Sequence, residues 1–262
     1  MIKAKKSLGQ NFLNDVNTLK KITNLIPIKN KNVLEVGPGT GNLTSHILKH
    51  EPKKLYLVEK DDNLVSFLQN KFRNKVTIIN EDILKINEKL ISNENLIVFG
   101  NLPYNISTEI LCKWITNLDN EKFWFENLVL MFQKEVSDRI IAKFNTSNYG
   151  RLSILANWKL EIKKIFDIQP ECFSPKPNVD SSLLIFKPKK KFFPIKDPKN
   201  LETITRIFFN HRRKMLKKPF YQIFNKDLNL EKKLNLDLNL RPQNLSPINY
   251  FEITKEYENL IY

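Results

Sequence analysis

Four consecutive residues, Asn101-Leu102-Pro103-Tyr104, are of the types that a receptor for a flat, amino-bearing base needs. The Asn101 amide and the Leu102 carbonyl can accept hydrogen bonds, Pro103 cannot continue a strand ladder, and the Tyr104 ring can stack on a base. The motif directly follows an apolar run at residues 96–99. These residue types therefore predict a nucleobase site at the end of a strand.

A second group of residues could bind a nucleotide. Gly37-Pro38-Gly39-Thr40-Gly41 follows an apolar run, and such a glycine turn lets the backbone approach a ligand closely. Asn42 stands where a dinucleotide fingerprint needs glycine or alanine, which disfavours NAD and FAD. Glu59 could accept hydrogen bonds from ribose hydroxyls and Asp82 from an adenine amino group. Each residue alone could be a turn or a helix cap, but their joint spacing favours a nucleotide site.

The elements that must position these residues alternate along the chain. Apolar runs predict strands at residues 32–36, 54–58, 76–79, 96–99 and 128–132, with helical spacing at 42–49 and 61–72. This alternation is typical of a parallel sheet wound with helices, and residues 162–166 and 182–186 are expected to close it as a final pair. Since such sheets bind ligands at the carboxyl ends of their strands, the glycine turn, both acids and Asn101 are expected to meet there.

Composition divides the chain into two expected domains. Prolines and lysines crowd together after Phe186, so we place a catalytic α/β domain at residues 1–187 and a small helical domain at 188–262. The net charge of +15 favours nucleic acid as a partner, although a bias toward AT-rich codons would also produce it. In the second domain we expect one helix face to pack while the other meets phosphates, through Arg206, Arg212, Arg213, Lys214 and Lys217.

Several classes of protein are disfavoured by what the chain contains. The two cysteines, Cys112 and Cys172, lie far apart without CxxC spacing, and the three histidines lack the spacing of metal ligands, so we expect no metal site. No segment approaches the length of a membrane span, and the N-terminus lacks the apolar run of a leader. We therefore expect a soluble cytoplasmic protein.

The motifs together resemble the KsgA family of ribosomal RNA adenine dimethyltransferases. Besides Asn101 to Tyr104, the resemblance covers most of the chain, through Gly9-Gln10-Asn11-Phe12-Leu13, Gln133-Lys134-Glu135-Val136, Tyr149-Gly150-Arg151-Leu152-Ser153 and Phe173-Ser174-Pro175-Lys176-Pro177 followed by Val179-Asp180-Ser181. It implies a Rossmann-like sheet that binds S-adenosylmethionine, and a monomer that dimethylates two adjacent adenosines near the 3′ end of small-subunit ribosomal RNA in the immature small subunit.

The resemblance also assigns residues to roles. Phe173 would be the stacking wall opposite Tyr104, although an aromatic ring in such a loop could instead fill the core. The catalytic residues would be Asn101, Leu102, Pro103, Tyr104 and Phe173, and the cofactor would be bound by Asn11, Leu13, Gly37, Gly39, Glu59, Asp82 and Asn101. Two alternatives stay open, an Erm-type methyltransferase of large-subunit ribosomal RNA and a non-catalytic ribosome-assembly factor that keeps the fold as a scaffold.

Overall fold

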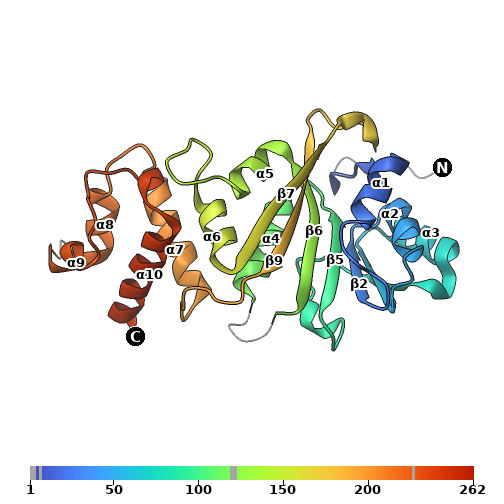
Figure 1. The fold of residues 1–262 in the computed structure, drawn as a ribbon, viewed down its shortest axis with the longest axis horizontal. Coiled ribbons are helices and arrows are strands. Elements are labelled where there is room, and N and C mark those ends of the chain that lie inside the picture. The colour runs from blue at the N-terminus through green and yellow to red at the C-terminus, as the bar shows by residue number, and fades with distance from the viewer. Residues whose placement is uncertain (1–3, 6–7, 119–122, 226–227) are drawn as a thin grey trace. The chain divides into compact units, whose positions relative to one another are not determined.

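The computed structural model describes residues 4–5, 8–118, 123–225 and 228–262. In this part of the chain a seven-stranded sheet has the order β4-β3-β2-β5-β6-β9-β7 (Figure 1). Its strands are β2 (Asn32–Val36), β3 (Lys54–Glu59), β4 (Thr77–Asn80), β5 (Leu96–Asn101), β6 (Phe125–Gln133), β7 (Leu160–Ile168) and β9 (Ser181–Pro188). The strands from β4 to β6 pair in parallel, and β9 runs antiparallel to β6. The predicted Rossmann-like α/β sheet is confirmed, with strand ends shifted by a few residues.

Two short strands, β1 (Phe12–Leu13) and β8 (Phe173–Ser174), pair antiparallel outside this sheet. The helices are α1 (Val16–Thr23), α2 (Asn42–Leu48), α3 (Asp62–Phe72), α4 (Ser107–Thr116), α5 (Lys134–Ile140), α6 (Arg151–Lys159), α7 (Pro198–Asn210), α8 (Lys217–Phe224), α9 (Leu228–Lys233) and α10 (Pro247–Ile261).

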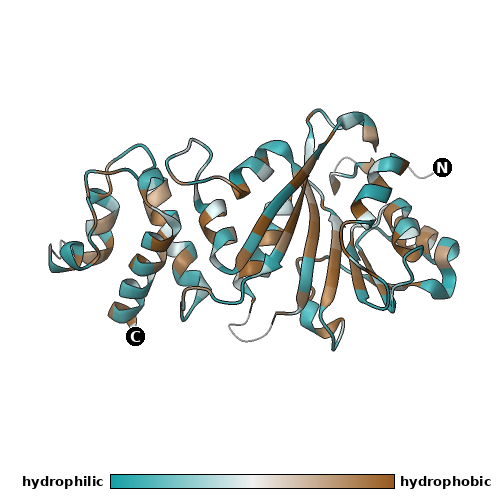
Figure 2. Cartoon of the chain, viewed as in Figure 1, coloured by the Kyte–Doolittle hydropathy of each residue, from teal (hydrophilic) through white to brown (hydrophobic). Residues whose placement is uncertain are grey.

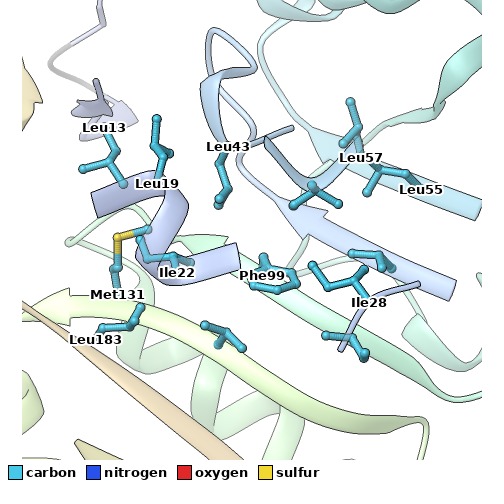
Figure 3. Close-up of a cluster of buried hydrophobic side chains, with 14 of the residues drawn as sticks. Leu13, Leu19, Ile22, Ile28, Leu43, Leu55, Leu57, Phe99, Met131 and Leu183 are labelled. Carbon is cyan, nitrogen blue, oxygen red and sulfur yellow. The ribbon is translucent and has the colours of Figure 1, made fainter. Parts of the chain in front are cut away.

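A buried apolar cluster holds α1 against the sheet. The helix begins where the Asp15 side chain accepts a hydrogen bond from the Thr18 amide at 2.7 Å, which caps its first turn. Leu19 and Ile22 then lie in this cluster, with Ile22 beside Met131 of β6 (Figure 3). Burying one such side chain contributes about 1.5–3 kcal/mol, so the buried face of α1 holds the helix firmly against the sheet. The segment before α1 is therefore held in place at its end.

The chain divides into two compact units. Unit 1 comprises Met1–Lys113, Glu121–Ser137 and Ile162–Pro188, and unit 2 comprises Trp114–Asn120, Asp138–Glu161 and Lys189–Tyr262. The strands of unit 1 are coloured mainly as hydrophobic in Figure 2, as expected for a sheet with both faces covered. Unit 2 takes in two segments that the sequence-based boundary at residues 187 and 188 places in the first domain, because α6 packs on α7 and α10.

We expected the basic residues Arg206, Arg212, Arg213, Lys214 and Lys217 to share one helix face, but they do not lie on one helix. Helix α7 ends at Asn210, residues 211–216 form a turn, and α8 begins at Lys217. The amides of Leu216 and Lys217 donate to the carbonyls of Leu240 and Leu238, at 2.8 and 3.1 Å, so they cannot continue the ladder of α7. Pro219 also fits the first turn of a helix better than its interior.

Candidate active site

A cavity of about 340 Å³ opens at the carboxyl ends of β2, β3 and β5 in unit 1. From β2 the chain runs to β3 and β4 on one side of the sheet and then crosses to β5 on the other side of β2, and a crevice forms at this switch point. The cavity brings together ten of the predicted site residues, namely Asn11, Leu13, Gly37, Gly39, Glu59, Asp82, Asn101, Leu102, Pro103 and Tyr104.

The glycine turn after β2 forms the floor of the cavity. Gly37 and Gly39 have φ values of +67° and +56°, a region that favours glycine. A Cβ atom on Gly39 would also lie 2.6 Å from the Phe12 ring, far inside van der Waals contact. The turn therefore needs glycine at position 39 both for its backbone conformation and for space.

Two acids occupy the ends of the next strands. Glu59, at the end of β3, is 8% exposed, and its Oε1 accepts the amides of Lys60 and Asp61, each at 3.0 Å. Burial raises the pKa of the Glu59 carboxyl. Asp82 follows β4 and accepts the Lys60 ammonium at 2.7 Å and the Leu84 amide at 3.0 Å. The Lys60 hydrogen bond is the main cause of the lowered pKa of Asp82, so this carboxylate is ionised at neutral pH.

The Asn101 side chain has a defined orientation. Its Nδ2 donates to the backbone carbonyl of Asn11 at 2.6 Å, so the amide oxygen points to the opposite side and is left as the acceptor. Leu102 is buried, and the half-buried Tyr104 shares a hydrogen bond between its hydroxyl and that of Ser181 at the start of β9. Burial raises the pKa of Tyr104, so the ring stays neutral. An oriented amide oxygen beside a fixed aromatic ring suits the binding of an amino-bearing base.

Comparison with known proteins decides between the families that share this arrangement. A family model described as ribosomal RNA adenine dimethylase matches residues 1–259. The chain belongs to this family. A similar protein named ribosomal RNA small subunit methyltransferase A, from Pelagibacter ubique (strain HTCC1062), is 64% identical over 259 residues, which are 99% of this chain and 98% of the relative.

Two solved structures resemble this dimethylase over nearly its whole length. A dimethyladenosine transferase from Plasmodium falciparum has a TM-score of 0.80 and 25% identity, with 95% of this chain and 98% of that one covered. The 23S rRNA methyltransferase ErmE has a TM-score of 0.67 and 18% identity, with 94% of this chain and 99% of that one covered. The second likeness shows the shared fold alone.

The donor set of the cavity fits S-adenosylmethionine, the methyl donor of this class of enzyme. The buried Glu59 carboxylate suits a ribose, Asp82 suits an adenine amino group, and the glycine turn leaves room beside the backbone. The apolar side chains of Leu13, Ile83 and Leu84 line the same cavity and suit the faces of a purine.

Phe173 does not line the cavity in this structure. It is 4% exposed, pairs with Leu13 across the β1–β8 ladder, and belongs to the buried cluster around α1. The structure thus places its ring in the core, the alternative that the sequence left open. Its stacking role in the dimethylase stays a prediction.

The sequence reasoning missed residues that the structure places in or behind the cavity. Glu35 of β2 is fully buried, accepts the Thr44 hydroxyl at 2.6 Å, and has a pKa raised to about 7, mainly by burial. Gln10 lines the cavity and donates to Asp61 at 3.2 Å. Gln10 lies inside the recognised motif at residues 9–13 and could have been found there, whereas Glu35 reads as one more strand residue.

The predicted RNA-contacting residues all lie in unit 2 but differ in their surroundings. Arg206 on α7, and Arg213, Lys214 and Lys217 beyond it, are exposed. Arg212 instead donates to the Ser147 carbonyl and, at 3.4 Å, to the Gln243 side chain, so it also holds two loops together.

Two further kinds of feature are absent from the residues that the structure describes. No group of three or more histidine, cysteine, aspartate or glutamate side chains is placed to hold a metal ion there. No helix in the same residues is long and apolar enough to cross a membrane.

Proposed function

We propose that this dimethylase transfers methyl groups from S-adenosylmethionine to the N6 amines of two adjacent adenosines near the 3′ end of 16S ribosomal RNA. The product is N6,N6-dimethyladenosine, and the reaction contributes to biogenesis of the small subunit. The observation that carries the proposal is the Asn101 amide, whose hydrogen bond to Asn11 presents its oxygen as an acceptor beside Tyr104. The relative that is 64% identical supports the small subunit as the source of the RNA.

The chain's own residues chiefly position and polarise the target amine. When bound, S-adenosylmethionine supplies a methyl group on a positively charged sulfur that leaves readily. The lone pair of an adenine amine is delocalised into the ring, which makes the amine a poor nucleophile. The Asn101 oxygen and the Leu102 carbonyl accept its two N–H bonds and favour a pyramidal nitrogen whose lone pair can attack the methyl carbon. In each transfer the N–C bond forms as the S–C bond breaks, the methylated nitrogen loses one proton to solvent, and S-adenosylhomocysteine is the product of the donor.

Aromatic walls hold the extruded base in this proposal. Tyr104 supplies one face, and its hydroxyl contact with Ser181 keeps the ring from rotating away. Phe173 supplies the second face once its ring leaves the core position described above. Stacking of this kind offsets an unstacking cost of a few kcal/mol.

In this proposal the two predicted domains have different tasks. The α/β domain, assigned to residues 1–187, binds the methyl donor and the base, and the helical domain at 188–262 binds RNA phosphates through Arg206, Arg212, Arg213, Lys214 and Lys217. The exposure of four of these five side chains supports this assignment. We further propose that the enzyme is a cytoplasmic monomer and that its substrate is an immature small subunit.

The test is methyl transfer from labelled S-adenosylmethionine to purified small and large ribosomal subunits that lack these methyl groups, followed by mapping of the modified nucleosides. Dimethyladenosine at adjacent small-subunit positions is the expected result. Label in the large subunit would instead assign the chain to the Erm-type alternative, and RNA binding without label would assign it to the scaffold alternative. The intact amide of Asn101 argues against the scaffold alternative. The 64% identical relative, which is named for the small subunit, argues against the Erm-type alternative.

A further inference from the structure

One half-buried ammonium joins helix α4 to a loop that lines the cavity. Lys113 lies on α4, the helix that follows the Asn101 to Tyr104 loop, and its side chain is 16% exposed. Its Nζ donates to the carbonyls of Ile83 and Ile86 at 2.7 and 2.5 Å, and to Glu88 Oε1 at 2.6 Å. All three partners lie on the loop that begins at Asp82.

This loop forms a wall of the cofactor cavity. Asp82, Ile83 and Leu84 line it, and a hydrogen bond from the Leu84 amide to the Asp82 side chain turns the backbone there. The residues after β4 lie outside the sheet ladder, so strand pairing does not hold them. The contacts with Lys113 therefore tie this wall to the helix behind the target-base loop.

The chemical groups in this contact indicate that Lys113 positions the loop more than it stabilises the fold. The Glu88 side chain is 5% exposed, and removing two charges from water offsets most of the attraction between them. A pair of apolar side chains would hold α4 to the loop as firmly. A half-buried ammonium that donates to these three acceptors additionally fixes where two loop carbonyls lie, which apolar packing does not.

We propose that Lys113 is a positioning residue for cofactor recognition, and that it holds the Asp82 to Glu88 loop where the loop distinguishes adenine from other purines. The inference rests on the proposed function, because it takes the ligand of this cavity to be an adenosyl compound. Lys113 does not touch the reacting atoms and acts through Asp82 and its neighbours.

The experiment is calorimetric titration of the full chain with S-adenosylhomocysteine and with its inosine analogue, in which oxygen replaces the adenine amino group. The protein as it stands is expected to prefer the adenosyl compound by about 10-fold or more, since the analogue leaves an Asp82 acceptor facing an oxygen. Lys113→Met is expected to reduce this preference to about threefold or less. Lys75→Met removes an exposed lysine from the segment before β4 and is the matched control, expected to keep the preference.

A second variant separates positioning from loss of stability. Lys113→Met leaves Glu88 buried beside an apolar group, whereas Lys113→Met/Glu88→Leu removes both charges and is expected to regain thermal stability without regaining the preference. A preference at the original value in either variant would overturn the inference. The proposed function fails separately, if the unaltered chain binds neither S-adenosylmethionine nor S-adenosylhomocysteine.

Discussion

Replacement of Asn101 by alanine separates two contributions of one amide. Its oxygen is the proposed acceptor for the target amine, and its Nδ2 holds the Asn11 carbonyl at 2.6 Å. Loss of one preorganised hydrogen-bonding group at a reacting centre typically lowers kcat by about 100- to 1000-fold. Loss of one neutral hydrogen bond costs about 0.5–1.5 kcal/mol, which weakens cofactor binding by about 2- to 12-fold.

The turnover defect should therefore exceed the binding defect by at least about tenfold. The assay compares kcat at saturating S-adenosylmethionine with the Kd for the same compound measured by calorimetry. Asn17→Ala, on the exposed side of α1, is the matched control and should change neither value. Equal losses in kcat and affinity would refute the reasoning, because Asn101 would then act only by holding the segment that carries Asn11.

Three further changes test the floor and walls of the cavity. Burial raises the pKa of Glu35 from 4.5 to about 7, so the folded state keeps a proton that the unfolded state releases, and the free energy of unfolding falls as pH rises through this window. The free energy of unfolding is measured in urea at about pH 5 and at about pH 7.5, and Glu35→Gln should remove about 2.5 kcal/mol of the fall between them. An unchanged pH dependence would contradict the cause. Gly39→Ala, whose Cβ would lie 2.6 Å from Phe12, should weaken S-adenosylmethionine binding by about 10-fold or more, whereas Gly150→Ala, with no atom nearer than 3.9 Å, should not. Phe173→Leu keeps most of the buried volume and should cost less than about 1.5 kcal/mol of stability while lowering turnover by about 10-fold; normal turnover would leave Phe173 with a purely structural role.

The parts of the site that could be predicted are those that follow from local pattern. A strand followed by Gly37 to Gly41 is visible in the sequence, and parallel strands bring Glu59, Asp82 and Asn101 to the same edge without further information. Those residues line the cavity as expected. Phe173 could not be placed in this way, because a two-residue pairing of β8 with β1 decides whether its ring lies in the core.

The single helix face expected for the basic residues is not formed, and the two compact units differ from the predicted domains, for a related reason. Charge and apolar spacing at residues 211–218 fit a helix, but the amides of Leu216 and Lys217 are taken by carbonyls more than twenty residues later. Likewise, α6 belongs to unit 2 because of its packing on α7 and α10. Propensity is a weak signal wherever a distant backbone segment competes for the same donors.

Polar contacts over long sequence separations recur behind the walls of the cavity. Asp61 accepts hydrogen bonds from Lys5 at 2.7 Å and Gln10 at 3.2 Å, which tie the segment before β1 to the N-terminus of α3. The Lys113 and Glu88 pair does the same for the loop after β4. Ion pairs contribute little net stability, but they are geometrically demanding. The sheet fixes the positions of the strand ends, and such pairs fix the positions of the two segments beside them. Together they can keep the floor of the cavity rigid. From the proposed role of Lys113, we expect single polar substitutions outside the lining to change which nucleoside the cavity accepts.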